Sequence, residues 1–242
     1  MMKPQEAMER LLSLGGFPEP FLKGSEISAK RWRRSHIDRI IREDLLDLEQ
    51  TREIKSIETL VDLLSERVGN AISYASLARD LEVSPHSIKK WIQILESLFV
   101  IFRVLPYTKN ISRSILKEPK IYFYDLGRLK SGSDGKFENL IACALLKRIH
   151  FLEDTQGDHR SMFYVRDKEK HEVDFLTIND SKCEWLIEVK ESNHVISRSL
   201  HYFSEKLNPE KTFQIVKNLD RNLQNNQIEI KQAAHWLSQL EC

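Results

Sequence analysis

Two acidic residues and a lysine fall in neighbouring stretches that the sequence predicts to be β-strands. His171–Ile178 is rich in β-forming residues, turn residues follow it, and Trp185–Val189 is apolar again. Because strand side chains alternate between faces, Glu188 and Lys190 share one face, and a hairpin would bring Asp174 beside Glu188. Charge inside an apolar strand is costly unless it is paired or binds a metal. The pattern therefore indicates a metal site, with an ordinary salt bridge at a strand end as the alternative.

Glu138 is another carboxylate in an unexpected place. Residues 136–150 predict a helix whose apolar stripe includes Ile141 and Leu145, and Glu138 falls on that stripe. The position is explained if the helix packs over the sheet and Glu138 points at the two strand carboxylates. The alternative is a glutamate in the first turn, which the helix dipole favours.

Together these side chains predict metal-dependent phosphodiester hydrolysis. Paired carboxylates provide the oxygen ligands that Mg²⁺ or Mn²⁺ prefers. In this hypothesis Asp174 and Glu188 bind the metal directly, and Glu138 holds a metal-bound water or helps to bind a second ion. Such an ion polarises a scissile phosphate and activates a water. Lys190 would orient that water or offset charge in the transition state.

A helix-turn-helix pattern lies earlier in the chain. Ser73 precedes a short helix expected at Tyr74–Asp80, and Ser84 followed by Pro85 is typical of the start of the next helix. That helix, Pro85–Leu98, is apolar on one side, and strand-like sequence follows it where a wing would lie. The candidate DNA-contacting residues on its other side are His86, Ser87, Lys89, Lys90 and Gln93. The alternative is a winged helix that only packs against protein.

A long charged helix is expected from Ala29 to Glu49. Its N-terminal part is basic and its C-terminal part acidic, an order that opposes the helix macrodipole, so packing must hold the helix. The basic residues are Lys30, Arg31, Arg33, Arg34, Arg39 and Arg42. This cluster is a candidate phosphate contact, and the alternatives are a solvated face or pairing with an acidic neighbour.

The remaining elements are expected from periodicity and turn signals. Helices are expected at residues 5–14, 56–69, 195–207 and 233–240, and further strands at residues 120–125, 162–165 and 212–216. Gly15–Pro20 predicts a rigid turn that is neither helix nor strand, and residues 107–116 predict a basic connector. From residue 120 onward the order β-α-β-β-β-α-β-α favours a mixed sheet flanked by helices.

Composition narrows the class of protein. The chain has 242 residues, 41% of them hydrophobic and 30% charged, and a formal net charge of +1, which excludes a globally basic coat for nucleic acid. Its three cysteines form no C-x-x-C pair, so neither a zinc knuckle nor a disulfide scaffold is expected. With no signal peptide and no long apolar run, we expect a cytoplasmic location and no contact with a membrane.

Several segments, in this order, carry a resemblance to a known family. They are GGFPEP (15–20), RWRRSHIDRIIREDL (31–45), the helix-turn-helix at 73–98, KEPKIYFYDLG (117–127), FEN (137–139), EVDF (172–175) and IEVK (187–190). The chain resembles the C-terminal region of a bacterial and archaeal family of predicted AAA+ ATPases. In that family an ATPase module is followed by a lid, a winged helix and a restriction-endonuclease-like domain of unassigned function. The hairpin itself resembles the PD-(D/E)XK nuclease motif.

The resemblance implies a mixed α+β fold in three parts. An all-α lid-like segment at 1–55 would be followed by a winged helix-turn-helix at 56–106. A nuclease-like α/β domain with a mixed sheet would occupy 107–242. Glu138, Asp174, Glu188 and Lys190 would correspond to the nuclease-like positions. The Walker motifs of the ATPase module are absent from this sequence, so we expect no ATP site and no ATP hydrolysis by this chain alone.

The predicted function is therefore that of the C-terminal part of an AAA+ ATPase, which binds DNA and carries a metal-dependent nuclease-like domain. The alternatives are a non-catalytic DNA-binding module, or a regulatory module that uses the basic helix to dock a separate ATPase chain. DNA and such an ATPase chain or another partner protein are the candidate partners. The sequence specifies neither the substrate nor the oligomeric state.

Overall fold

The structure is a computed structural model that describes residues 2–40, 51–108, 117–129, 134–192, 195–219, 221–225 and 227–241. Two sequence predictions fall partly outside these residues. They are the acidic end of the long charged helix, with Arg42, and most of the basic connector at 107–116. Among the described residues, no helix is long and apolar enough to cross a membrane.

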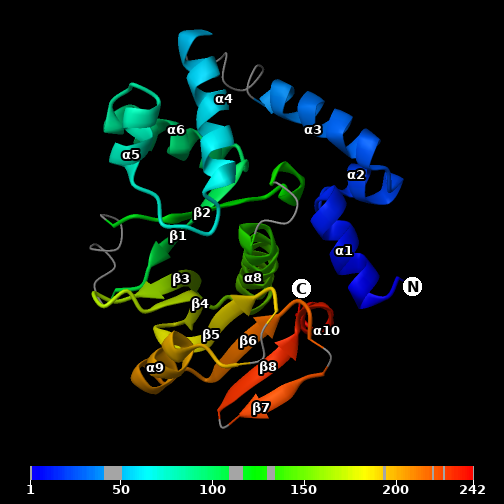
Figure 1. Cartoon of the computed structure of the whole chain (residues 1–242), viewed down its shortest axis with the longest axis vertical. Coiled ribbons are helices and arrows are strands. Elements are labelled where there is room, and N and C mark those ends of the chain that lie inside the picture. The colour runs from blue at the N-terminus through cyan, green and yellow to red at the C-terminus, as the bar shows by residue number, and fades with distance from the viewer. Residues whose placement is uncertain are drawn as a thin grey trace. The chain divides into compact units, whose positions relative to one another are not determined.

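Helices form the N-terminal part of the chain and a mixed sheet follows, so the predicted α+β class is confirmed (Figure 1). The helices before the sheet are α1 (Pro4–Leu14), α2 (Pro18–Lys23), α3 (Glu26–Arg39), α4 (Thr51–Glu66), α5 (Tyr74–Asp80) and α6 (Pro85–Ser97). Those that follow are the 3-10 turn η2 (Leu126–Arg128), α8 (Asp134–Gln156), α9 (Arg198–Leu207) and α10 (Ala233–Leu237).

Eight strands form one sheet in the order β2-β1-β3-β4-β5-β6-β8-β7. They are β1 (Ile101–Pro106), β2 (Lys120–Phe123), β3 (Arg160–Arg166), β4 (Glu172–Asn179), β5 (Lys182–Lys190), β6 (Lys211–Val216), β7 (Leu223–Asn225) and β8 (Ile228–Gln232). Strand β4 is antiparallel to both β3 and β5, whereas β6 is parallel to both β5 and β8. The sheet is therefore mixed, as expected.

The chain folds into two compact units, each built from separate segments. The sheet unit comprises Met1–Met8, Val104–Lys117 and Leu140–Cys242, and the helical unit comprises Glu9–Arg103 and Glu118–Asn139. Strand β1 and helix α8 each continue along the chain from the helical unit into the sheet unit. The division into three parts at 55/56 and 106/107 stays a prediction.

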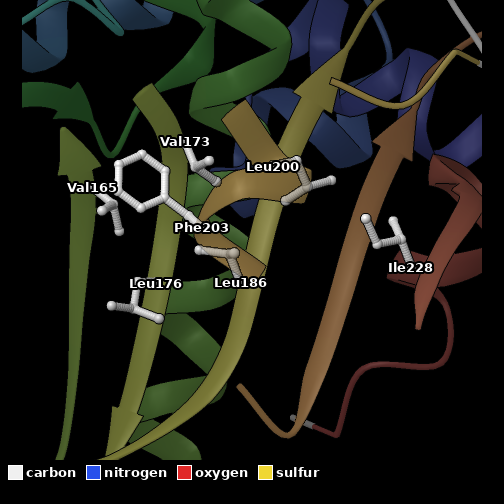
Figure 2. Packing of buried hydrophobic residues seen from close by; sticks show 7 residues of the cluster. All are labelled: Val165, Val173, Leu176, Leu186, Leu200, Phe203 and Ile228. Carbon is white, nitrogen blue, oxygen red and sulfur yellow. The ribbon is translucent and has the colours of Figure 1, made fainter. Parts of the chain in front are cut away.

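In the sheet unit, α9 packs its apolar side against the sheet. Leu200 and Phe203 of α9 pack with Leu186 of β5 and with apolar residues of the neighbouring strands (Figure 2). This packing follows from the helical spacing of the apolar residues in α9 and the period of two in the strands. Strands β4 and β5, which carry the predicted site, are thereby fixed on a buried core.

The helical unit contains the expected helix-turn-helix. Ser84 is the N-cap of α6, its hydroxyl accepts a hydrogen bond from the Ser87 backbone at 3.0 Å, and Pro85 occupies the first helical position. Helix α6 buries Ile88, Trp91, Ile92 and Leu95. Strand β1 follows α6 where a wing was expected.

Two local predictions were wrong. Residues 18–20 begin helix α2 rather than forming a turn without helix, because proline is well tolerated in the first helical turn. Gly24 ends that helix with a left-handed φ of 67°. Strands β7 and β8 were also missed, although Ile228 and Ile230 alternate with polar residues as a half-buried strand requires.

Candidate functional site

A tight hairpin brings the predicted site residues of the sheet unit together. Asp180 and Ser181 connect β4 to β5 with φ values of 42° and 75°. Two consecutive positive φ values are typical of the two-residue turns whose twist matches that of paired strands. The turn therefore fixes the register in which Phe175 pairs with Ile187 and Leu176 with Leu186.

Asp174 is attached directly to β5 by its side chain. The backbone N–H of Val189 donates a hydrogen bond to Asp174 Oδ2 at 2.9 Å. Nearby, the pairing of β4 with β3 shifts between Phe163 and Val165, so the ladder is irregular at this end of β4. The Asp174 carboxylate thus lies against the residue that separates Glu188 from Lys190.

Glu188 and Lys190 interact with each other. Lys190 Nζ lies 2.7 Å from Glu188 Oε1. The Glu188 side chain is 6% exposed, whereas that of Lys190 is 40% exposed and reaches solvent. The structure therefore brings Asp174, Glu188 and Lys190 together on one hairpin, and their catalytic role stays a prediction.

Gln214 is the neighbour of Glu188 on the other side of β5. The two residues are paired in the parallel ladder between β5 and β6. The Gln214 side chain accepts a hydrogen bond from Ser197 N at 3.0 Å and donates one to Val195 O at 3.0 Å. It thus ties β6 to the segment that precedes α9, and the surroundings of Glu188 are polar on both sides of the strand.

Glu138 lies in the helical unit, where it has local partners. Its Oε1 accepts a hydrogen bond from the Tyr122 hydroxyl at 2.5 Å and lies 3.3 Å from Lys120 Nζ. Lys120 is 1% exposed, so its ammonium needs a counter-charge. Gly69 also lies close, since a Cβ there would come within 2.9 Å of Glu138 Oε2. These contacts give the glutamate a structural explanation, and its metal role stays a prediction.

The sequence reasoning missed a second buried carboxylate on β5. Glu184 Oε1 accepts hydrogen bonds from Arg148 at 2.9 Å and from Arg160 at 2.7 Å. Its Oε2 accepts one from Thr177 Oγ1 at 2.9 Å. The Arg148 guanidinium also lies 3.7 Å above the Trp185 ring. We call Arg148, Arg160, Thr177 and Glu184 the arginine cluster.

A β-bulge determines where Glu184 points. Thr177 pairs with Trp185 but the next residue, Ile178, pairs with Cys183, so Glu184 is the extra residue on β5. Strict alternation would place Glu184 on the same face as Glu188. Instead Glu184 and Trp185 both contact Arg148, and the bulge separates the environments of the two glutamates.

The arginine cluster keeps Glu184 ionised. Burial alone would raise the pKa of this carboxyl, but the hydrogen bonds from Arg148, Thr177 and Arg160 and the Arg148 charge outweigh it, so the pKa is lowered. Arg160 in addition contacts Asp158 at 3.0 Å. The cluster therefore joins two guanidinium groups to two carboxylates and has the composition of a structural ion network.

The hairpin between β3 and β4 carries a group that sequence reasoning treated only as a charged turn. Ligand atoms of Asp167, Glu169 and His171 lie close enough together to share a metal ion, and this is the one such group of three among the described residues. The His171 ring hydrogen-bonds Asp167 at 3.0 Å. The D-x-E-x-H spacing in the sequence was the available signal. An exposed acidic turn is common without a metal.

The candidate DNA-contacting residues lie where the helix-turn-helix hypothesis requires them. On α6, His86, Lys89, Lys90 and Gln93 are exposed and Ser87 is half-buried. The apolar residues of the same helix are buried, so the polar side is the one that solvent reaches. DNA contact through this side stays a prediction.

The sequence matches two known families. Residues 5–133, more than half of the chain, match the family described as "Domain of unknown function (DUF8612)". The chain belongs to the DUF8612 family. Residues 134–236 match "Domain of unknown function (DUF4143)". The DUF8612 match thus ends where α8 begins, and the DUF4143 match includes Glu138 and the β4–β5 hairpin of this DUF8612 protein.

The curated relatives of this DUF8612 chain carry no assigned function. It is 28% identical over 188 residues to the uncharacterized protein MJ1544 of Methanocaldococcus jannaschii, covering 72% of this chain and 40% of the relative. It is 28% identical over 123 residues to the uncharacterized protein Rv2008c of Mycobacterium tuberculosis, covering 51% of this chain and 28% of the relative. The aligned part is thus less than half of either relative. No solved structure matches at a significant level.

Proposed function

We propose that this chain binds DNA and hydrolyses phosphodiester bonds with a divalent metal ion held by the β4–β5 hairpin. The observation that carries the proposal is the convergence of Asp174, Glu188 and Lys190 within one hairpin of the sheet unit. The order of elements supports it, because α8, β3, β4, β5, α9 and β6 follow one another with β5 parallel to β6. This order agrees with the restriction-endonuclease-like resemblance.

The donor set fits Mg²⁺ or Mn²⁺. Asp174 and Glu188 offer carboxylate oxygens, the ligands that these hard cations prefer. The Val189 hydrogen bond orients Asp174 without exhausting it, because each carboxylate has about four lone-pair sites. When bound, the metal would supply charge that polarises a phosphate and lowers the pKa of water.

The residues of the chain then have separate roles. Asp174 and Glu188 would hold the ion, and burial of Glu188 fixes its carboxylate in one position. Lys190 reaches solvent from the same strand, where its ammonium can donate to an attacking water or to the charged phosphate oxygens. Glu138 would assist through a metal-bound water, as the family resemblance suggests.

The test measures metal binding and cleavage on the same samples. Wild-type protein is compared with Asp174→Ala/Glu188→Ala by Mn²⁺ calorimetry and a plasmid-nicking assay. We expect saturable binding and nicking in the wild type and neither in the double variant. Glu169→Gln is the matched control, because it removes one ligand from the exposed group on the β3–β4 turn. Mn²⁺ binding that survives in the double variant but is lost in Glu169→Gln would contradict the proposal.

DNA binding is tested separately on α6. Lys89→Gln/Lys90→Gln should weaken duplex binding and lower the slope of log affinity against log salt by about two, one unit for each phosphate contact. Lys55→Gln, an exposed lysine of α4, is the control and should leave the slope unchanged. Equal slopes in all three proteins would contradict DNA contact through α6.

A second candidate is a module that docks a separate AAA+ ATPase chain. The supporting observation is the basic side of α3, where Lys30, Arg31, Arg34 and Arg39 are all exposed. This candidate predicts no DNA binding until the ATPase chain is added. Co-purification with an ATPase encoded beside this chain, lost in Arg34→Glu/Arg39→Glu, would support it. Unchanged co-purification of that variant would contradict docking through α3.

A further inference from the structure

The helical unit contains a pocket that the proposed nuclease does not use. Its volume is about 280 Å³, and its lining includes Lys30 and Arg33 of α3, Lys136 of α8 and the η2 residues Gly127 and Leu129. A carboxylate, Glu26, also lines it. Three cations therefore meet one anion around a space smaller than the pockets of about 300–1,000 Å³ that bind drug-sized ligands.

The cations are held in place by neutral groups rather than by carboxylates. Lys136 is 5% exposed and donates to the Leu129 carbonyl at 3.0 Å. Arg33 donates to the Leu14 carbonyl at 3.1 Å. In the part of the chain that the structure describes, none of the three cations forms an ion pair. Their positive charge is thus only partly balanced within the fold.

The absence of a side chain at Gly127 allows Arg33 to lie against the backbone. A Cβ at this glycine would overlap the Arg33 guanidinium. The arginine is therefore positioned by η2 as well as by its own helix, which is the preorganisation that a guanidinium needs to bind an anion through two hydrogen bonds.

The electrostatics agree with this geometry. Burial lowers the pKa of Lys136, and the nearby Arg33 charge lowers it further, with Asp125 and Glu26 in partial opposition. Arg128, next to Gly127, has its pKa lowered by burial, and the Arg33 charge lowers it further while Asp125 opposes the shift. Like charges at close range are unfavourable unless an anion lies between them.

We infer that this pocket binds a phosphate group of a small ligand, with Lys30, Arg33 and Lys136 as its contacts. An anion with two or more negative charges matches the excess of positive charge, and the volume suits one or two phosphate groups. Arginine and lysine are the side chains that proteins use for this purpose. The inference does not depend on the nuclease proposal, because none of its residues lies in the sheet unit.

The test is calorimetric titration of the full chain with inorganic pyrophosphate. We expect saturable binding, weakened about tenfold or more in Lys30→Gln, since a charged hydrogen bond is worth roughly 1.5–3 kcal/mol. Arg31→Gln removes an exposed charge from the next position of α3 and should stay within about twofold of wild type. Equal weakening in the two variants, or no saturable binding by wild type, would overturn the inference.

A charge-neutral variant tests the geometry itself. Gly127→Ala keeps every cation but forces Arg33 to move, so we expect pyrophosphate affinity to fall by about as much as in Lys30→Gln. Circular dichroism and urea unfolding confirm that the variant is folded. If a folded Gly127→Ala protein binds pyrophosphate as wild type does, Arg33 is not a contact and the assigned site is wrong.

A competition experiment distinguishes the source of the phosphate. A short DNA duplex is bound to the wild type and pyrophosphate is added at constant ionic strength. If DNA remains bound, the pocket takes a small phosphorylated ligand as inferred. If pyrophosphate releases the DNA from wild type but not from Lys30→Gln, the pocket holds a backbone phosphate of nucleic acid, and the inferred small ligand is wrong.

Discussion

Strand β5 carries two buried glutamates whose surroundings differ in charge. Glu184 lies in the arginine cluster, where two guanidinium groups face two carboxylates. Glu188 lies four residues further along, where two carboxylates, its own and that of Asp174, accompany the single cation Lys190. The first set is balanced, and the second has one more negative charge than positive among its named members. A charge excess held on a rigid strand is what distinguishes a candidate metal site from a structural ion network.

Removing Glu184 should have the largest effect on stability. Glu184→Ala leaves two buried guanidinium groups without their shared counter-charge, so we expect the free energy of unfolding to fall by about 3–5 kcal/mol. Urea unfolding measures it. Glu229→Ala removes a half-exposed partner of Lys231 and should cost less than about 1 kcal/mol. Similar losses in the two variants would show that the cluster has no special structural role.

Metal affinity should separate the two glutamates in the opposite sense. Glu188→Gln is expected to weaken Mn²⁺ binding by about tenfold or more, since even residues that only support a metal ligand contribute 10–100-fold. Glu184→Gln should leave Mn²⁺ affinity within about twofold of wild type, measured by calorimetry at a temperature where both variants are folded. A loss of Mn²⁺ binding in Glu184→Gln alone would reverse the assignment of roles.

A smaller effect is expected at Thr177. Its hydroxyl donates to Glu184 and accepts from the Trp185 backbone, so Thr177→Val removes two hydrogen bonds inside the arginine cluster. We expect a loss of about 1–2 kcal/mol in the free energy of unfolding. Thr59→Val, at an exposed position of α4, is the matched control and should change stability by less than about 0.5 kcal/mol.

Acid should weaken the arginine cluster gradually. The folded-state pKa of Glu184 lies below its ordinary value of 4.5, so the stability that this carboxylate contributes is present above that pH and is lost as the pH falls through the folded-state pKa. The free energy of unfolding of wild type should therefore decrease more steeply below about pH 4.5 than that of Glu184→Gln. Parallel pH profiles would show that Glu184 is not stabilised as an anion.

Local patterns were enough to predict the elements that carry the candidate sites. Serine followed by proline predicted the start of α6, and turn residues between two apolar runs predicted the β4–β5 hairpin. Both signals depend on residues close in the sequence. The proximity of Asp174 to β5 followed from the hairpin alone, and for that reason it could be expected without any knowledge of the rest of the sheet.

Features that depend on distant partners could not be predicted in this way. Arg148 is 36 residues from Glu184, and nothing in either local sequence indicates that they meet. The bulge at Glu184 is equally hidden, because strict alternation would have placed the residue on the other face. Glu138 was assigned from its place on a helix stripe, whereas its partner Lys120 belongs to a strand.

The two compact units are built from discontinuous segments, which has a consequence for how the chain is made and handled. During synthesis the helical unit cannot be completed before residues 118–139 emerge, and the sheet unit must wait for its C-terminal strands although it also includes Met1–Met8. A fragment cut at any single position between residues 9 and 139 therefore takes a segment from at least one unit. Expression of either half alone is expected to yield aggregated or protease-sensitive material, so the activities proposed for the hairpin and the pocket are best assayed in the intact chain.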